Sequence, residues 1–376
     1  MVHPRFFIII PLILMTVGCQ PRGQIRKEGS SNHYAQGFTT SCQNTFCRLT
    51  VHNPWEKAKN IALDYYLVGR GHSIPDSLAG KRIIRVPVER VICLSTSHVA
   101  FLDALGEIDK ITGISGEAYL MNPALRERVT AGQTTDVGYG QNLNYEEIIR
   151  QKPDLVMVYG VDSEITGFLD KFRDLGIPAV IIAEYLEETP LGKAEWIKFI
   201  APFFDKQPLA DSLFAETEKR YQQLAGKVSH VEKMPGVMVG LPYRDNWWIP
   251  GGNSYLAKLI ADAGGDYIGK ENDSHESYVI SMEEAFIRAS SAEIWLHVGM
   301  VTRKEEILKS DSRFADFGLF RNGKILNNNK RFTPGGGNDF WESGTIHPDL
   351  ILEDLIRIFH PGILPEGELN YYREVQ

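Results

Sequence analysis

Residue types that bind metals or carry out covalent chemistry are few and scattered in this chain. Its 376 residues include 4 Cys and 10 His. His98, His230, His275 and His297 are candidate metal ligands by type, but their positions show no ligand spacing. The sequence also lacks a P-loop, a G-x-S-x-G nucleophile turn and a His-Glu-x-x-His helix. These observations favour a protein that binds a ligand over an enzyme, and they predict no intrinsic cofactor and no resident metal.

The cysteines give information on folding rather than on catalysis. Cys42 and Cys47 are separated by four residues, and in an oxidising compartment they would either form a small local disulfide or remain two free thiols. Cys93 lies in the apolar run 91–94, which is typical of a buried core cysteine. Because there is no second C-x-x-C pair or Cys/His cluster, we do not expect a structural zinc site.

Composition and charge exclude one large class of partner. The chain has 40 Lys+Arg and 48 Asp+Glu, for a formal net charge of −8, and the basic residues form no block. Nucleic-acid binding normally needs a basic patch, so we exclude nucleic acid as a partner. With 43% hydrophobic residues, the chain has enough apolar mass for more than one core.

The first 18 residues have the features of a secretory signal peptide. Arg5 precedes an apolar run over 6–15, which is about half as long as a membrane-spanning helix. Thr16-Val17-Gly18-Cys19 resembles the lipobox of bacterial lipoproteins, in which the cysteine becomes the lipidated first residue; Thr16 stands where Leu is usual. Residues 19–32 are polar and lack periodicity, as in a flexible tether. We therefore expect a membrane-anchored lipoprotein of the periplasm, lipidated at Cys19.

Hydrophobic patterning divides the rest of the chain into an extension and two lobes. Residues 33–86 form an N-terminal extension with a β-hairpin made from strands at 48–51 and 61–68. Residues 87–190 alternate apolar strands with helical stretches, which predicts an α/β lobe with a mostly parallel sheet, called lobe 1 here. Its predicted strands are 91–94, 111–114, 155–158 and 179–182, and its predicted helices are 98–105, 145–150 and 165–175.

One long helix separates this lobe from a second one. Within the bridging segment 191–230, Pro208 at a first helical position and no breaker before Gly226 predict a helix over 208–228, about 30 Å long. Residues 231–376 form lobe 2 with a C-terminal helix. Its predicted strands are 237–241, 293–298 and 324–326, and its predicted helices are 254–263, 282–289 and 347–359. The fold class is therefore α/β, with two Rossmann-like lobes bridged by a single long helix, plus the β extension.

A short pattern repeats in the two lobes. In each of them an acidic pair opens a short helix that runs into a buried strand: Glu146-Glu147 in lobe 1 and Glu283-Glu284 in lobe 2. A helix dipole alone favours acidic residues in a first turn. Their occurrence in both lobes supports two similar halves, and a cleft between two such halves is a common ligand site.

From about residue 87 to 361 the chain resembles the periplasmic substrate-binding proteins of iron-chelate and cobalamin ABC importers. The resemblance rests on the stretches 90–97, 105–114, 136–138, 143–148, 152–156 and 262–265, and on the bridging helix. The extension, Trp196 and the tail 336–344 look like versions from the Bacteroides group. The resemblance implies a monomeric receptor with no chemistry of its own, which binds a ferric siderophore, haem or cobalamin. Its partners would be an ABC permease and that permease's ATPase.

The same resemblance assigns a docking residue. In the cobalamin-binding member, one Glu of each lobe docks onto arginines of the permease. Glu146, in Asn144-Tyr145-Glu146, is the lobe 1 counterpart, whereas Asn253 stands at the lobe 2 position. The resemblance also places an Asp, and an Arg four residues later, in the loop before the last helix; here these positions hold Asp339 and Ser343.

Residues that follow the predicted strands are the candidate ligand contacts. Large, partly apolar chelates need aromatic faces and a few polar anchors, and the carboxyl ends of the strands face the cleft. Consecutive Trp247 and Trp248 in a polar loop favour a cleft wall, whereas alternation within a strand favours a core position for Trp295. The candidate ligand contacts are His98, Tyr139, Tyr159, Tyr243, Arg244, Trp247, Trp248, Asp339 and Trp341.

Two alternatives use the same two-lobed plan. A chelatase-like enzyme would use His98 and Glu184, and a receptor for bare zinc or manganese would need about three His and a carboxylate. His98 itself could be an axial ligand to a metal chelate or an ordinary hydrogen-bonded structural residue.

Overall fold

The computed structural model describes residues 32–43, 45–161 and 165–376. The predicted signal peptide, Cys19 and nearly all of the predicted tether lie outside these ranges. Within the described ranges, no helix combines the length and the apolar character needed to cross a membrane.

The extension folds into one four-stranded sheet in the order β1-β2-β3-β4. The strands are β1 (Phe38–Cys42), β2 (Cys47–His52), β3 (Ala62–Gly69) and β4 (Ile83–Val86). The antiparallel pairing of β2 with β3 confirms the predicted hairpin; β1 and β4 were not predicted. Cys42 and Cys47 lie opposite each other at the turn end of the β1–β2 pair and form a disulfide. The sheet packs on the bridging segment, where the rings of Phe38 and Trp196 are 5.0 Å apart.

Lobe 1 is a parallel five-stranded sheet with helices around it, as predicted. The sheet has the order β7-β6-β5-β8-β9. Its central strands are buried along their whole length, as expected for a sheet covered on both faces. The elements are β5 (Val91–Cys93), α1 (Thr96–Ala104), β6 (Ile111–Ile114), α2 (Pro123–Thr130), β7 (Thr135–Asp136), α3 (Tyr145–Gln151), β8 (Leu155–Val158), α4 (Ile165–Asp174) and β9 (Ala179–Ile181).

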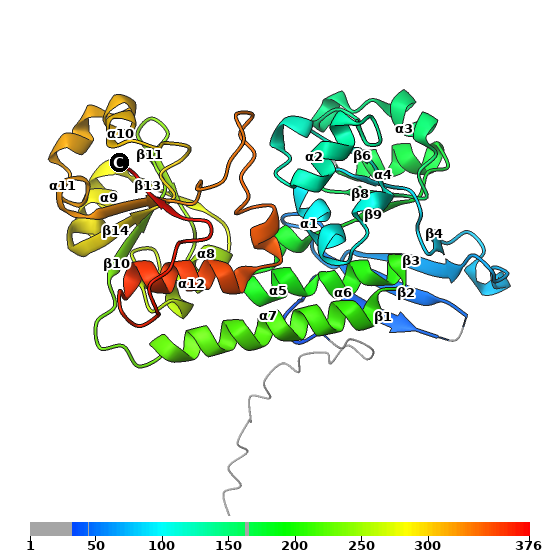
Figure 1. Ribbon diagram of the computed structural model, residues 1–376, viewed down its shortest axis with the longest axis horizontal. Coiled ribbons are helices and arrows are strands. Elements are labelled where there is room, and N and C mark those ends of the chain that lie inside the picture. The colour runs from blue at the N-terminus through cyan, green and yellow to red at the C-terminus, as the bar shows by residue number, and fades with distance from the viewer. Residues whose placement is uncertain (1–31, 44, 162–164) are drawn as a thin grey trace, which may run out of the picture.

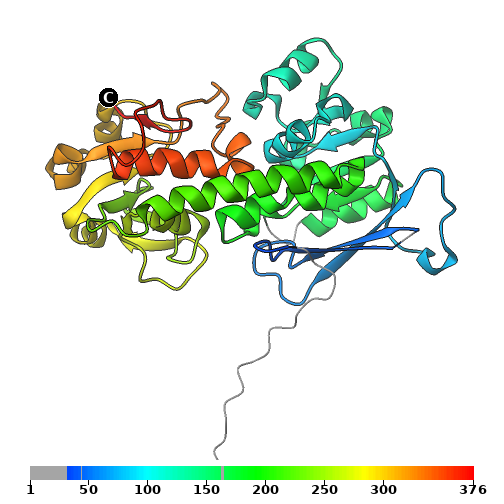
Figure 2. The ribbon, with the colours of Figure 1, turned by 60° about the horizontal axis from the view of Figure 1, so that its bottom comes forward.

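The bridge contains the predicted long helix. After α5 (Pro190–Glu195) and α6 (Ile197–Ile200), helix α7 (Gln207–Val228) extends for 22 residues, with Pro208 in its first turn. Figure 1 shows the two lobes side by side above α7, and Figure 2 shows α7 running across both of them, with the blue extension sheet on the lobe 1 side. The C-terminal helix α12 (Pro348–Phe359) packs on α7.

Lobe 2 has a second five-stranded sheet in the order β12-β10-β14-β15-β16, parallel except for the last strand. The main-sheet strands are β10 (Gly236–Val239), β12 (Asp266–Tyr267), β14 (Ala292–Leu296), β15 (Lys324–Asn327) and β16 (Arg373–Glu374). The surrounding helices are α8 (Tyr255–Asp262), α9 (Met282–Arg288), α10 (Lys304–Ser310) and α11 (Gly318–Asn322).

The two adjacent tryptophans lie in a separate antiparallel strand pair, whereas the sequence predicts a loop there. β11 (Asn246–Ile249) pairs with β13 (Tyr278–Ser281), so Trp247 and Trp248 lie in a strand and not in a loop. Successive residues of a strand face opposite sides. Trp247 is therefore 0% exposed, packed against Trp295 and Phe314, while Trp248 remains 55% exposed. Trp295 is buried, as predicted.

The repeated acidic pairs have the same local structure in both lobes. The Asn144 side chain accepts a hydrogen bond from the Glu147 N–H at the start of α3, and the Ser281 side chain accepts one from the Glu284 N–H at the start of α9. Each helix then leads into a central strand, β8 or β14. This confirms the repeat inferred from the sequence.

Candidate functional site

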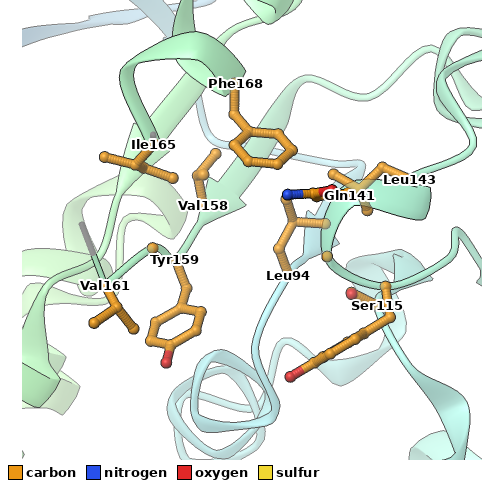
Figure 3. A pocket seen from close by; sticks show the side chains of 12 residues that line it. Leu94, Ser115, Gln141, Leu143, Val158, Tyr159, Val161, Ile165 and Phe168 are labelled. Carbon is orange, nitrogen blue, oxygen red and sulfur yellow. The ribbon is translucent and has the colours of Figure 1, made fainter. Parts of the chain in front are cut away.

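Two cavities lie where the parallel strands of the lobes end. The smaller one, called the lobe 1 pocket, has a volume of about 240 Å³ and follows the carboxyl ends of β5, β6, β7 and β8. In Figure 3 the apolar side chains of Leu94, Leu143, Val158, Ile165 and Phe168 surround it. The larger one, called the cleft, has a volume of about 1220 Å³ and lies between the lobes.

Three parts of the chain build the cleft. The extension contributes its β2–β3 turn, lobe 1 contributes the segment after β9, and lobe 2 contributes residues that follow β10, β11 and β14. The turn is held against lobe 1 because the Glu56 N–H donates to the carbonyl of Val161 (3.0 Å). The main lining residues are His52, Asn53, Trp55, Glu56 and Lys57 from the extension, Tyr185, Glu188 and Lys193 from lobe 1 and the bridge, and Trp248, Tyr255, His275, His297 and Trp341 from lobe 2.

Four of the predicted contacts line these cavities. Tyr139 and Tyr159 are exposed at the lobe 1 pocket, and Trp248 and Trp341 line the cleft with about half of their surface exposed. The ring of Tyr159 meets that of Tyr185 edge-on at 5.3 Å, and Tyr185 lines the cleft. This aromatic pair therefore links the two cavities.

His98, a predicted ligand contact, is buried away from both cavities. The side chain belongs to the first turns of α1, is 0% exposed and lines neither cavity. Burial lowers its pKa to about 3, so the ring is neutral at ordinary pH. Ser95 caps α1, and the helix then turns His98 toward the interior of lobe 1.

Four further predicted contacts lie outside both cavities. Tyr243 and Arg244 form an exposed turn before β11, with the Arg244 guanidinium over the Tyr243 ring at 5.3 Å. Asp339 is nearly buried and its carboxylate forms an ion pair with Arg331. Trp247 is enclosed in the core of lobe 2. These four side chains therefore lie away from the cleft: Tyr243 and Arg244 because of the turn, Asp339 because of its ion pair, and Trp247 because of strand alternation.

A partly buried histidine, His297, lies at the cleft instead. His297 follows β14, and its Nε2 lies 2.7 Å from the hydroxyl oxygen of Tyr372. Burial lowers the pKa of His297 to about 3, so it presents a neutral imidazole to the cleft. The described residues hold no group of three or more His, Cys, Asp or Glu side chains that could bind a metal ion.

Lys193 was not predicted, and it lies at the floor of the cleft with only 8% of its surface exposed. Its ammonium lies over the ring of Tyr255 at 4.6 Å and over that of Trp341 at 5.6 Å. Burial lowers the pKa of Lys193, while the charge of Glu184 acts in the opposite direction. Glu184 itself accepts a hydrogen bond from the Ser97 hydroxyl (2.5 Å), and burial raises its pKa.

The extension residues at the cleft were also missed. Trp55 is half-buried at the cleft wall, beside the exposed Glu56 and Lys57. A signal was present in the sequence, because Trp55 follows the Asn53-Pro54 turn and precedes a polar run. A tryptophan in such a turn has no apolar neighbours in sequence, which is typical of an aromatic that contacts another element or a ligand.

The candidate docking residue is accessible. Glu146 is exposed in the first turn of α3, whereas its neighbour Glu147 pairs with Arg150 (2.6 Å). In lobe 2, both Asn253 and Glu283 are exposed.

Comparison with known proteins gives consistent results. A family profile described as periplasmic binding protein matches residues 91–330. An uncharacterized lipoprotein of Methanocaldococcus jannaschii is 30% identical over 305 residues, covering 77% of this chain and 70% of the relative. A periplasmic haem-binding protein from Pseudomonas aeruginosa shares the fold with a TM-score of 0.58 and 16% identity, over 77% of this chain and 98% of the other. A possible iron-binding periplasmic protein from Staphylococcus epidermidis shares it with a TM-score of 0.56 and 21% identity, over 72% and 98%.

Proposed function

The chain belongs to the periplasmic binding protein family, and we propose that it captures a metal chelate in the cleft and delivers it to an ABC permease. It is a binding protein and not an enzyme. Its compartment is extracytoplasmic, and in the proposal Cys19 carries the lipid that holds the chain at the membrane. The ligand is a ferric siderophore, haem or cobalamin, and the protein acts as a monomer together with the permease and its ATPase.

The observation that carries this proposal is the size and lining of the cleft. A volume of about 1220 Å³ exceeds the roughly 300–1,000 Å³ of a pocket for a drug-sized ligand. Trp55, Trp248 and Trp341 line it from the extension and lobe 2, and Tyr185 lines it from lobe 1. Aromatic faces from three parts of the chain suit a large ligand with flat or rounded apolar surfaces.

The solved relatives support the choice of ligand class. Two proteins with this fold are described as a haem-binding protein and as a possible iron-binding protein. The absence of a metal-binding cluster among the described residues favours a complete chelate over a bare zinc or manganese ion. A chelate brings its own ligands, so the protein needs to supply only shape, aromatic surface and a few polar anchors.

A titration of residues 20–376 tests the proposal. These residues include all those that the structure describes. Haemin, cyanocobalamin, several ferric siderophores, Zn²⁺ and Mn²⁺ are added while Trp fluorescence and visible absorption are recorded. We expect saturable quenching by at least one chelate, because Trp55, Trp248 and Trp341 line the cleft. Tight binding of Zn²⁺ with no response to any chelate would contradict the proposal.

A further inference from the structure

We propose that Lys193 forms an anion-binding subsite at the floor of the cleft, which receives a carboxylate or phenolate oxygen of the bound chelate. This inference rests on the function proposed above and adds the charge of the ligand to it. The subsite is the ammonium of Lys193 with the rings of Tyr255 and Trp341 beside it. All three side chains line the cleft.

Lys193 is a buried charge without a counter-ion among the described residues. Only 8% of its surface is exposed, yet it makes no ion pair with any residue in the part of the chain that the structure describes. Its neighbour in the bridge, Lys198, is also largely buried but pairs with Glu195 at 3.0 Å. Buried charges in proteins are normally paired, so an unpaired one at the wall of a cavity indicates a partner that comes from outside.

The carboxylates near Lys193 are already engaged with other partners. Glu184 is the acidic group whose charge reaches Lys193, but it bonds to the Ser97 hydroxyl and forms no ion pair with the lysine. Glu187 accepts the backbone N–H groups of Gln36 and Gly37. Glu188 pairs with His275 at 3.1 Å. None of these three groups forms an ion pair with Lys193, which leaves the lysine available to a ligand in the cleft that it lines.

The aromatic rings beside Lys193 leave room for a ligand. A ring face compensates an ammonium only weakly, but it can do so without blocking access to the cation. Tyr255 and Trp341 come from lobe 2, whereas Lys193 comes from α5 in the bridge, so the subsite spans the boundary between the two parts. A ligand oxygen bound to Lys193 would place the rest of the ligand against Trp341.

The charged residues at the rim of the cleft limit where the negative charge of the ligand can lie. Glu56 and Glu276 are exposed carboxylates that line the cleft, and Lys57 is a basic residue beside them. A ligand that is negative on all sides would meet these carboxylates. We therefore expect a ligand with its negative oxygen at the end that reaches the floor.

Matched chelates test the inference on residues 20–376. Haemin is compared with its dimethyl ester, and ferric enterobactin, which is anionic, with ferrichrome, which is neutral. Dissociation constants come from Trp quenching. We expect that, in any pair that binds, the anionic member binds at least about tenfold more tightly, which corresponds to about 1.4 kcal/mol. A neutral member that binds as tightly as its anionic partner would overturn the inference without the use of any variant.

Variants then assign the effect to Lys193. Lys193→Met should weaken the anionic chelate about tenfold and leave the neutral one within twofold, and Lys193→Arg should retain most of the anionic binding. Lys258→Met, which removes an exposed lysine paired with Asp262 on α8, is the control and should change neither. Lys193→Met could instead weaken both chelates equally, or lower folding stability with no change in selectivity. Either result would show that Lys193 has only a structural role and would overturn the inference.

The same titration separates the two proposals. If no chelate binds, the proposed receptor function fails and the subsite fails with it. If only neutral chelates bind, the receptor function stands and the subsite alone is wrong.

Discussion

The backbone N–H of Asn122 in lobe 1 donates a hydrogen bond of 2.6 Å to the side-chain carboxylate of Glu342, which precedes the C-terminal helix of lobe 2. The adjacent Met121 N–H donates to the other oxygen of the same carboxylate (2.8 Å). Met121 and Asn122 lie directly before α2, and the bond from Asn122 to Glu342 joins two segments that are 220 residues apart in the sequence. The lobes are therefore connected by a contact other than the bridging helices.

More of the same loop crosses between the lobes. The Thr333 hydroxyl donates to the carbonyl of Ala118 (2.6 Å), and a β-carbon added to Gly337 would lie 2.1 Å from the carbonyl oxygen of Tyr119. Only glycine allows two backbones to approach so closely. We call residues 330–344 the strap loop. With the strap loop on one side and α7 on the other, lobe movements should be small, and the ligand should enter a cleft that is largely formed beforehand.

Glu342 should make stability depend on pH. Burial raises its pKa to about 8, even though the two backbone N–H donors favour the charged form. Between about pH 5 and 8 the folded protein holds a proton that the unfolded chain releases, so this group lowers the free energy of unfolding as the pH rises, by up to about 1.4 kcal/mol per pH unit. The stabilising contribution is complete below about pH 4.5 and is lost above pH 8.

The variant Glu342→Gln tests this prediction in urea unfolding at several pH values. We expect the free energy of unfolding of the original chain to fall steadily relative to that of the variant as the pH rises from 5 to 8, because glutamine resembles the protonated glutamate and does not titrate. Glu276→Gln, which changes an exposed carboxylate, is the control and should show no such trend. A constant difference over this range would contradict the assigned titration.

Substitutions of the two adjacent tryptophans of β11 should have different effects, one on ligand binding and the other on stability. Trp248 faces the cleft, so Trp248→Ala should weaken the chelate found by titration about tenfold and change the free energy of unfolding by less than about 1 kcal/mol. Trp247 is enclosed in the lobe 2 core, so Trp247→Ala should lower the free energy of unfolding by about 3–5 kcal/mol. Fluorescence titration and urea unfolding measure the two effects, and an exchange of the two phenotypes would refute the placement of these side chains.

Local sequence signals were sufficient for much of the fold. Pro208 and the unbroken run after it predicted α7, and the acidic pairs predicted the starts of α3 and α9, because caps and helix starts are set by residues a few positions apart. The resemblance to a known family added the arrangement of the lobes.

The rest of the site depends on contacts between segments that are far apart in the sequence. The sequence around Trp247 and Trp248 predicts a loop, because β11 forms a strand only by pairing with β13, which is distant in the sequence. The extension reaches the cleft through packing on Trp196 and a backbone bond to Val161, and neither contact leaves a local pattern. Lys193 carries no signal in the sequence, because a single lysine in a helical stretch is normally solvated; only the fold places its ammonium over the rings of Tyr255 and Trp341.

The attachment of the segment before β1 to the rest of the protein should depend on Glu187. Its carboxylate accepts the backbone N–H groups of Gln36 and Gly37 and the indole N–H of the buried Trp196 (2.8 Å for the last two). Glu187→Ala would leave these donors unpaired and should lower the free energy of unfolding by about 3 kcal/mol or more, measured by urea unfolding. The neighbouring Glu188→Ala removes a half-exposed carboxylate and should cost less than about 1 kcal/mol. Equal effects of the two variants would contradict this role of Glu187.

Docking on a permease should depend on Glu146 but not on the cleft. Glu146 is exposed and lines neither cavity, so Glu146→Ala should leave chelate affinity within twofold of the original value. Because charged pairs at an interface act mainly on register and association rate, we expect about tenfold weaker association with the cognate permease, and a smaller loss at high salt. Glu232→Ala, at an exposed site after α7, is the matched control. Association is measured with the permease in nanodiscs, and equal losses of chelate and permease binding by Glu146→Ala would exclude the docking role.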